Sequence, residues 1–189
     1  AAARLLAGAR ERGWPIVHVR IAFRPDYADL ARNTPIFQRT AELGAVREGE
    51  WGSAFFDLLA PQDSPREFVL THNRVSAFYG TSLEPLLRLL QAREVIVAGG
   101  APHPGGEGPG RDPPAPGVEG QGAAVATHPV VESTVRDAAD RGFEVQVAAD
   151  ACAAADPAAH QAALASMALI AQVTDVDTVL ATTSSKDAP

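Results

Sequence analysis

Cysteine, long apolar runs and clustered basic residues are all scarce in this 189-residue chain. The single cysteine excludes a disulfide framework and any cysteine-based zinc cluster. No apolar run reaches the roughly 20 residues of a membrane span, and no signal segment opens the sequence. The formal charge of −7 argues against a nucleic-acid partner, because phosphate binding needs a clustered basic face. We therefore expect a cytoplasmic protein with neither a membrane nor a nucleic-acid partner.

What the chain does have is the composition of one globular domain, with 46% apolar and 21% charged residues. Short apolar runs alternate with helical patterns along it. These runs predict strands at residues 15–21, 67–71, 94–98, 143–148 and 177–181. Such alternation favours parallel pairing with helices on both faces of the sheet. The prediction is an α/β fold, a single three-layer α/β/α domain over residues 1–189 with a mostly parallel sheet.

The chain opens with a helix rather than a strand. Residues 1–12 (AAARLLAGARER) have a helical pattern and lead straight into the first predicted strand. A doubly wound domain usually begins with its central strand, so we expect that first central strand to be missing, with unpaired sheet edges as the result. A helix-first domain is the alternative that the composition allows.

Capping patterns mark the helices that lie between the later strands. Thr81 with Glu84 has the spacing of a capping box. Asp156 before a proline predicts an N-cap for a helix that runs to about residue 170. A helix from about residue 129 is expected to end at a cation and a C-cap glycine, Arg141 and Gly142.

The segment 100–124 interrupts this pattern. It holds eight glycines and six prolines in 25 residues, a composition that does not form a packed element. It lies between a predicted strand and a predicted helix, where connections usually take about 2–6 residues. We interpret it as a disordered insertion in a βα loop. A tolerated loop and retained non-coding sequence are both consistent with it.

Polar and aromatic side chains follow the predicted strand at 67–71, at the edge where open parallel sheets bind ligands. They are His72, Arg74, Ser76, Phe78 and Tyr79. Together they indicate a pocket rim with a cationic floor. Packing in the core is the alternative for the two aromatic residues.

Three segments of the chain resemble the isochorismatase-like cysteine hydrolase superfamily. They are RVSAFYGTSLEPLLR, VATHPVVESTVRDAADRGFEV and DACAAADPAAHQAALASMA, in that order. The similarity covers residues 15–173 apart from the segment 100–124. The resemblance implies a parallel sheet flanked by helices, common homo-oligomers, and hydrolysis of small amides or of a vinyl ether by an Asp–Lys–Cys triad.

None of the three triad residues that the resemblance implies is found at its position. The aspartate would end the first central strand, a segment that we expect this chain to lack. The lysine position is occupied by His72, and the cysteine position by Val130. A thiol at a helix start is activated by the helix dipole, whereas an isopropyl group attacks nothing. Histidine still offers a charge or a proton, but not a nucleophile.

Other residues near the predicted site offer less. Cys152 follows a different strand and is interpreted as a buried structural thiol. Thr127 is expected to cap the helix at 129, and His128 stands beside the position of the nucleophile; both are candidate substrate contacts. An exposed loop histidine is the alternative for His128. The five histidines have no ligand-like spacing, so we expect no metal and no cofactor.

Two classes of function remain. One is a hydrolase by resemblance, with impaired or absent catalysis because the triad is not intact. The other is a non-catalytic relative that binds a small molecule or acts as an oligomer partner. In both cases we expect a small-molecule ligand and a homo-oligomer.

Overall fold

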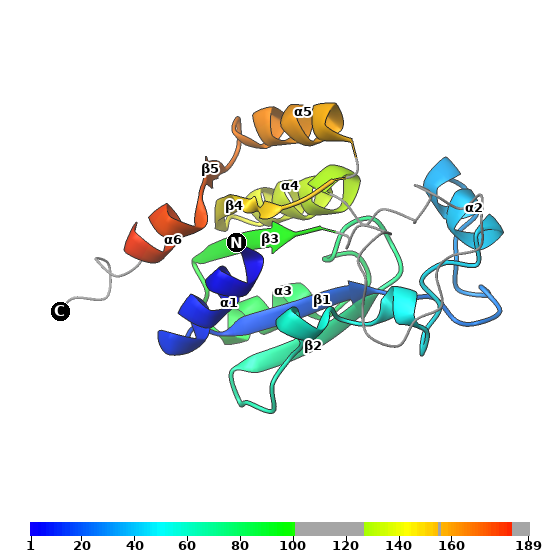
Figure 1. Cartoon of the computed structure of the whole chain (residues 1–189), viewed down its shortest axis with the longest axis horizontal. Coiled ribbons are helices and arrows are strands. Elements are labelled where there is room, and N and C mark those ends of the chain that lie inside the picture. Colours follow the sequence, from blue (N-terminus) through cyan, green and yellow to red (C-terminus); the bar gives the residue numbers. More distant parts are fainter. Residues whose placement is uncertain (101–126, 155, 183–189) are drawn as a thin grey trace.

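The computed structural model describes residues 1–100, 127–154 and 156–182 (Figure 1). The helices are α1 (Ala2–Glu11), α2 (Pro35–Glu42), α3 (Leu83–Leu89), α4 (Glu132–Asp140), α5 (Pro157–Met167) and α6 (Val176–Thr182). The strands are β1 (Ile16–Ile21), β2 (Glu67–His72), β3 (Glu94–Gly99), β4 (Glu144–Cys152) and β5 (Gln172–Thr174). Short helical turns lie at Trp51–Ser53 (η1) and Asp57–Leu59 (η2), and a π-helical turn at Thr127–Val131 (η3). Most of the segment 100–124 lies outside the described residues.

The described strands form two parallel sheets, with orders β1-β2 and β3-β4-β5. In the first, Ile16 pairs with Glu67, and in the second Val95 pairs with Val145. The predicted parallel pairing is confirmed, but the strands lie in two sheets, not in one. Both sheets contribute to one core, because Val17 of β1 packs against the same cluster as the β3 and β4 valines.

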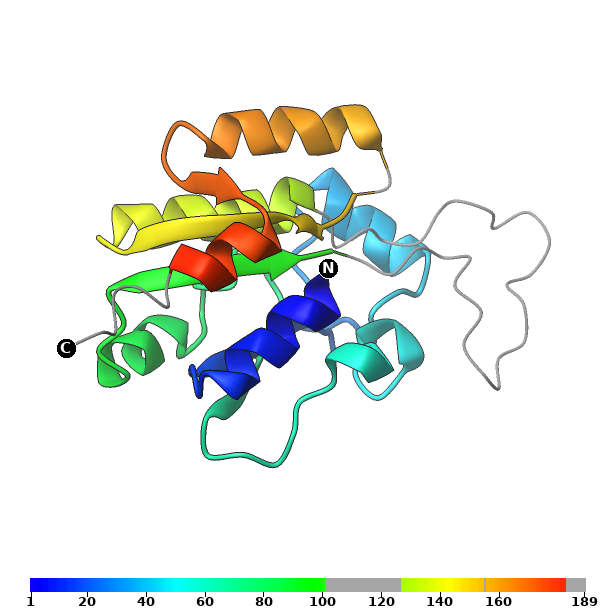
Figure 2. The same cartoon turned by 60° about the vertical axis from the view of Figure 1, so that its left-hand side comes forward.

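Helices cover both faces of β3 and β4, which confirms the predicted three layers. On one face α3, α4 and α5 pack through a core that includes Leu87, Val135 and Met167. On the other face Ala148 of β4 meets Val179 of α6 and partly buried residues of α1. Figure 2 shows α1 and α6 together on this second face. The alternation of buried side chains along β4 therefore feeds two cores.

Two of the predicted helix ends are confirmed. Asp156 precedes α5, and its side chain accepts a hydrogen bond from the N–H of Ala158 at 2.9 Å. After α4, Gly142 adopts φ = +80°, a conformation that glycine takes without strain. The preceding Arg141 is the C-cap of α4. One bound is wrong: α5 ends at Met167, three residues before the predicted end.

The predicted strand at 177–181 is wrong. These residues belong to α6, and the last strand is the three-residue β5 just before it. The side chain of Asp175 accepts a hydrogen bond from the N–H of Thr178 at 2.7 Å, which stabilises the start of the helix. A short apolar run does not by itself distinguish a buried strand from a buried helical turn.

The predicted capping box at Thr81 is also wrong. Ser82 is the N-cap of α3, and the Thr81 hydroxyl donates to the carbonyl of Ala77 while it accepts from the N–H of Leu83. The carboxylate of Glu84 is bound to Arg141 of α4 at 2.9 Å and does not reach back to the cap. A tertiary ion pair thus replaces the local hydrogen bond.

A buried carboxylate joins α1, β1 and the start of β2. Glu67, with 3% of its side chain exposed, accepts from Arg10 at 2.8 and 3.0 Å and lies 2.8 Å from Nε2 of His18. The N–H of Gln62 donates to the same carboxylate at 2.9 Å. Arg10 also donates to the carbonyl of Ala60. This Glu67 cluster pins the first helix and the loop before β2 to the two-stranded sheet.

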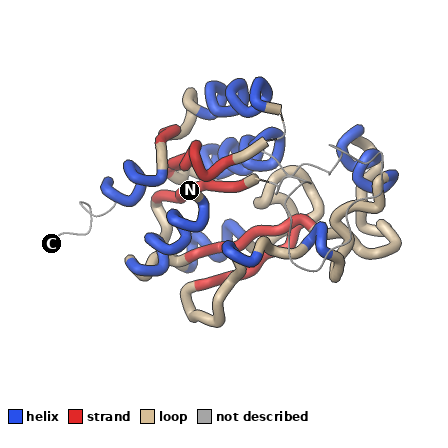
Figure 3. The backbone as a smooth tube through the Cα atoms, in the orientation of Figure 1, coloured by secondary structure: helices blue, strands red, loops and turns tan. Residues whose placement is uncertain are grey.

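Loop segments gather at the end of the molecule that carries α2 (Figure 3). A small second core, which includes Phe23, Tyr27 and Phe37, packs α2 against the loop after β1. Across the described ranges, no helix has the length and apolar character needed to cross a membrane.

Candidate functional site

The site predicted from the sequence lies where β1, β2, β3 and β4 end. All described strand pairings are parallel, and the arrows of β1 and β3 point the same way in Figure 1. Their carboxyl ends therefore share one edge of the molecule, the edge at which open α/β sheets bind ligands.

His72 ends β2 and is buried, with 4% of its surface exposed. Its carbonyl accepts a hydrogen bond from the N–H of Ala22, the residue after β1, at 3.1 Å. Among the described residues its Nδ1 has no hydrogen-bond partner. Burial lowers the pKa of His72, and the backbone of Arg74 and Ser76 opposes that shift only in part. At neutral pH this side chain is therefore a neutral imidazole that carries no charge.

Arg74 ties the loop after β2 to the loop after β1. Its Nη1 donates to the carbonyl of Asp29 at 3.1 Å and to the carbonyl and side-chain oxygens of Asn73. Asn73 in turn donates to the carboxylate of Asp29 at 3.2 Å. All three hydrogen bonds of Arg74 use the same nitrogen, so the guanidinium is anchored at one end of its fork.

The next three predicted contacts lie in different surroundings. Ser76 is buried, and its hydroxyl accepts from the N–H of Phe78 at 3.2 Å. Phe78 is buried in the main core, with its ring 6.4 Å from that of Phe143, which is the packing that the sequence left open. Tyr79 is 66% exposed. The loop thus turns Ser76 and Phe78 inward and leaves Tyr79 at the surface.

Thr134 connects this loop to the turn that carries Val130. The Thr134 hydroxyl donates to the carbonyl of Val130 at 2.9 Å and accepts from the N–H of Ala77 at 3.1 Å. These two hydrogen bonds hold the turn η3 against the loop after β2. Thr134 is therefore not the ordinary helix-face residue that the sequence predicted. A threonine four residues after the candidate position in a helix was the available signal.

The backbone at the end of β3 also approaches the η3 turn closely. A Cβ at Gly99 would lie 3.3 Å from a methyl group of Val131, which is itself buried. Val130 beside it is partly buried. The structure thus places Val130 at a helix start, between the end of β3 and the loop after β2. That is the environment in which a cysteine thiolate is stabilised.

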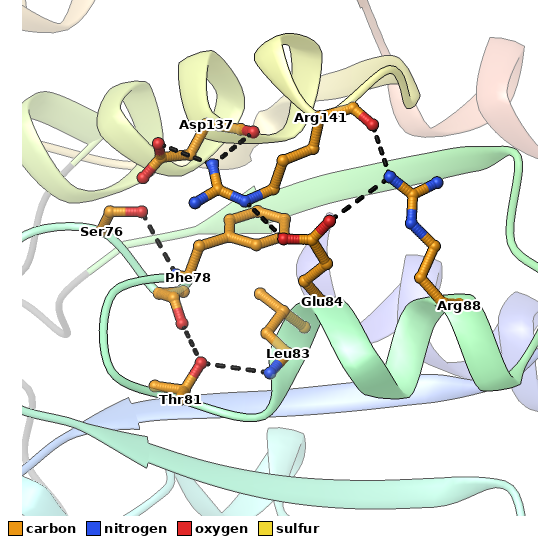
Figure 4. Close-up of polar contacts among 9 residues, drawn as sticks. Ser76, Phe78, Thr81, Leu83, Glu84, Arg88, Asp137 and Arg141 are labelled. Atoms are coloured by element: carbon orange, nitrogen blue, oxygen red, sulfur yellow. Dashed lines mark hydrogen bonds and ion pairs between the residues drawn. The ribbon is translucent and has the colours of Figure 1, made fainter.

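An ion-pair network holds α3 and α4 together beneath the loop (Figure 4). Arg141 of α4 binds Glu84 of α3 at 2.9 Å and Asp137 at 2.8 Å, and these carboxylates raise the pKa of Arg141. Its guanidinium also lies 4.7 Å from the centre of the Phe78 ring. Arg88 donates to the carbonyl of Arg141 at 2.6 Å. The conformation of the loop is fixed from both helices.

Cys152 ends β4 and is buried, as the sequence predicted. Burial raises the pKa of its thiol to about 11, so the thiolate is scarcely populated at neutral pH. Cys152 pairs with Gly99 in the register of β3 and β4, away from the start of α4.

The backbone of Thr127 and His128 lies in the η3 turn, while their side chains fall outside the described part of the chain. Thr127 is not the N-cap of α4, because η3 precedes that helix and its N-cap is Val131. Within the described residues, no group of three or more histidine, cysteine, aspartate or glutamate side chains is arranged to hold a metal ion.

Comparisons with known proteins agree with this arrangement. The family model described as the isochorismatase domain matches residues 1–104 and 124–178. The ureidoacrylate amidohydrolase RutB of Methylorubrum extorquens is 29% identical over 171 residues, which make up 84% of this chain and 58% of that protein. The maleamate amidohydrolase of Pseudomonas putida is 37% identical over 102 residues, 52% of this chain and 44% of that protein. The chain thus spans less than three fifths of either relative.

A solved structure has the same fold. The crystal structure of an isochorismatase family protein from Desulfovibrio vulgaris Hildenborough matches with a TM-score of 0.73 and 26% sequence identity. The match covers 94% of this chain and 79% of that one. The family match leaves out residues 105–123, which lie within the segment 100–124.

Proposed function

Because the chain belongs to the isochorismatase family of hydrolases, we propose that it binds a small amide or carboxylic acid at this edge and does not hydrolyse it through a thiolate. The observation that carries this proposal is the residue in the η3 turn. The turn is held in place by Thr134, and it presents Val130 where the family resemblance implies a cysteine.

The chemistry of the remaining groups supports binding without covalent catalysis. A valine has no nucleophilic atom, and the one thiol of the chain is Cys152, whose pKa is raised to about 11 by burial. Covalent hydrolysis needs a populated nucleophile next to a base. In this proposal the site keeps its framework and lacks that nucleophile.

The proposed ligand contacts come from the loop after β2 and from η3. Arg74 has its anchored nitrogen on the protein side and offers the rest of its fork to a carboxylate. The neutral His72 offers hydrogen bonds to an amide or hydroxyl group rather than a charge. The further proposed contacts are Ser76, Phe78, Tyr79, Thr127 and His128.

A hydrolase is the second candidate, since two similar proteins are named amidohydrolases. The named substrates of these relatives, ureidoacrylate and maleamate, are therefore the first probes for this chain. Both carry a carboxylate and a carbonyl next to nitrogen, which is the pairing that Arg74 and His72 suit in the proposed site.

The test measures binding and turnover on the same protein. We expect isothermal titration to show binding of at least one probe and ammonia release to stay at the level of buffer. Arg74→Ala is expected to weaken binding by about tenfold, the usual effect of one charged hydrogen bond. Arg32→Ala, at an exposed position on a neighbouring loop, is the matched control and leaves binding unchanged.

The outcomes separate the two candidates. Release of ammonia that iodoacetamide blocks and that Cys152→Ser abolishes would establish the hydrolase and overturn our proposal. Failure of the folded protein to bind either probe or to release ammonia from them would overturn the assignment of ligand class.

A further inference from the structure

A groove of about 530 Å³ lies between β2 and α3, far along the chain from the residues of the proposed site. Its apolar lining comes from Phe68, Val69 and Leu70 of the strand and from Pro85, Leu86 and Leu89 of the helix. Val69 is 48% exposed and Leu89 is 79% exposed. Apolar side chains gathered at such a groove indicate an interaction surface.

The backbone of β2 is also open along this groove. Within the described residues β2 pairs with β1 and with no other strand. The carbonyls of Arg66 and His72 accept hydrogen bonds from the β1 side. Because bonding alternates along a parallel strand, the N–H and C=O groups of Glu67, Val69 and Thr71 point outward. This row of unpaired groups is a template for another extended strand.

The edge of β2 lacks the features that usually prevent such pairing. Its sequence, EFVLTH, contains no proline and no lysine, and no bulge interrupts its register with β1. Its central residue is a β-branched valine, which favours strand pairing.

We propose that the edge of β2 pairs with β2 of a second copy of this chain, antiparallel about a twofold axis at Val69. The two sheets then join into one four-stranded sheet, and the two α3 helices face each other across the axis. An isologous contact of this kind closes after two copies. The proposal is independent of the ligand proposed above.

Charge complementarity favours this occupant and this register. Pairing about Val69 sets Glu67 of one copy opposite Thr71 of the other, whose hydroxyl accepts a hydrogen bond from Arg20 at 3.0 Å. The acidic corner of one edge thus meets the basic corner of the other. A register centred on Glu67 would bring two carboxylates together, which costs free energy. In a chain with a formal charge of −7, the interface needs this pairing of unlike groups.

The test is sedimentation velocity of the full chain over a wide range of concentration. We expect a reversible monomer–dimer equilibrium in the wild type. Val69→Lys places two like charges opposite each other on the axis and raises the dimer dissociation constant at least about tenfold. Val69 is half exposed, so the longer side chain reaches solvent in the monomer and the circular dichroism spectrum stays unchanged.

Two further measurements make the test specific to this edge. Leu169→Lys, at a residue 85% exposed after α5, is the matched control and leaves the dissociation constant unchanged. Mixing Val69→Lys with Val69→Glu restores the dimer, because opposite charges then face each other on the axis. A monomeric wild type, a dimer that Val69→Lys leaves intact, or a mixture that stays monomeric would each overturn the proposal.

Discussion

Removing the charge of Glu67 is expected to destabilise the fold at neutral pH and much less in acid. Hydrogen bonds from Arg10, and with them those from Gln62 and His18, lower the pKa of Glu67 from 4.5 to about 2. The side chain is 3% exposed, so water screens these interactions little. The difference between the two pKa values corresponds to about 3 kcal/mol of folding free energy at pH 7.

Glu67→Gln tests this magnitude because it keeps the shape of the side chain and removes the charge. The amide nitrogen also turns a donor toward Arg10, which has no acceptor to offer. We expect a loss of about 3 kcal/mol at pH 7, a large part of the 5–15 kcal/mol typical of a domain. The assay is urea unfolding followed by the fluorescence of the two tryptophans.

The pH dependence has a defined sign. The pKa of Glu67 is lower in the folded state, so its stabilisation is complete above pH 4.5 and is lost as pH falls toward 2. The gap between wild type and Glu67→Gln should therefore shrink to roughly 1.5 kcal/mol at pH 3. Glu48→Gln, at an exposed residue, is the control and leaves stability unchanged. A gap below about 0.5 kcal/mol at pH 7, the range of ordinary surface substitutions, or a gap that does not change with pH, would refute the reasoning.

Two further predictions concern the candidate site. Thr134→Val leaves the N–H of Ala77 without its acceptor and should cost about 1–2 kcal/mol in thermal unfolding, whereas Ser133→Ala should cost little; equal losses in the two variants would remove the role assigned to Thr134. Cys152 should react with a thiol reagent far more slowly in the native protein than in urea, because burial raises its pKa to about 11; native labelling as fast as that of the unfolded chain would contradict its burial.

Local patterns in the sequence predicted most of the described elements. Four of the five apolar runs are strands, because a buried strand in a parallel sheet is apolar along its whole length. Asp156 and Gly142 predicted helix ends because each acts through its own backbone neighbourhood. The error at α6 has the same origin, since a run of five apolar-rich residues fits a strand and a helical turn equally well.

Contacts between residues distant in the chain were not predictable in this way. Glu67 meets Arg10 across 57 positions, and Thr134 meets Ala77 across the same number. Neither pair has a spacing that a local pattern records. Likewise, the Thr81 and Glu84 pattern is genuine in the sequence, but Arg141 competes for the Glu84 carboxylate once α4 packs against α3. Family resemblance, rather than spacing, identified His72 and Val130 as the positions that matter.

The most direct test of the proposed function is hydrolysis of maleamate and ureidoacrylate by the purified chain, with and without iodoacetamide. With Val130 in the η3 turn and Cys152 buried, we expect binding of a probe without release of ammonia, whether or not the thiol reagent is present. Turnover that iodoacetamide stops and that Cys152→Ser abolishes would contradict this expectation and show that the buried thiol is the nucleophile.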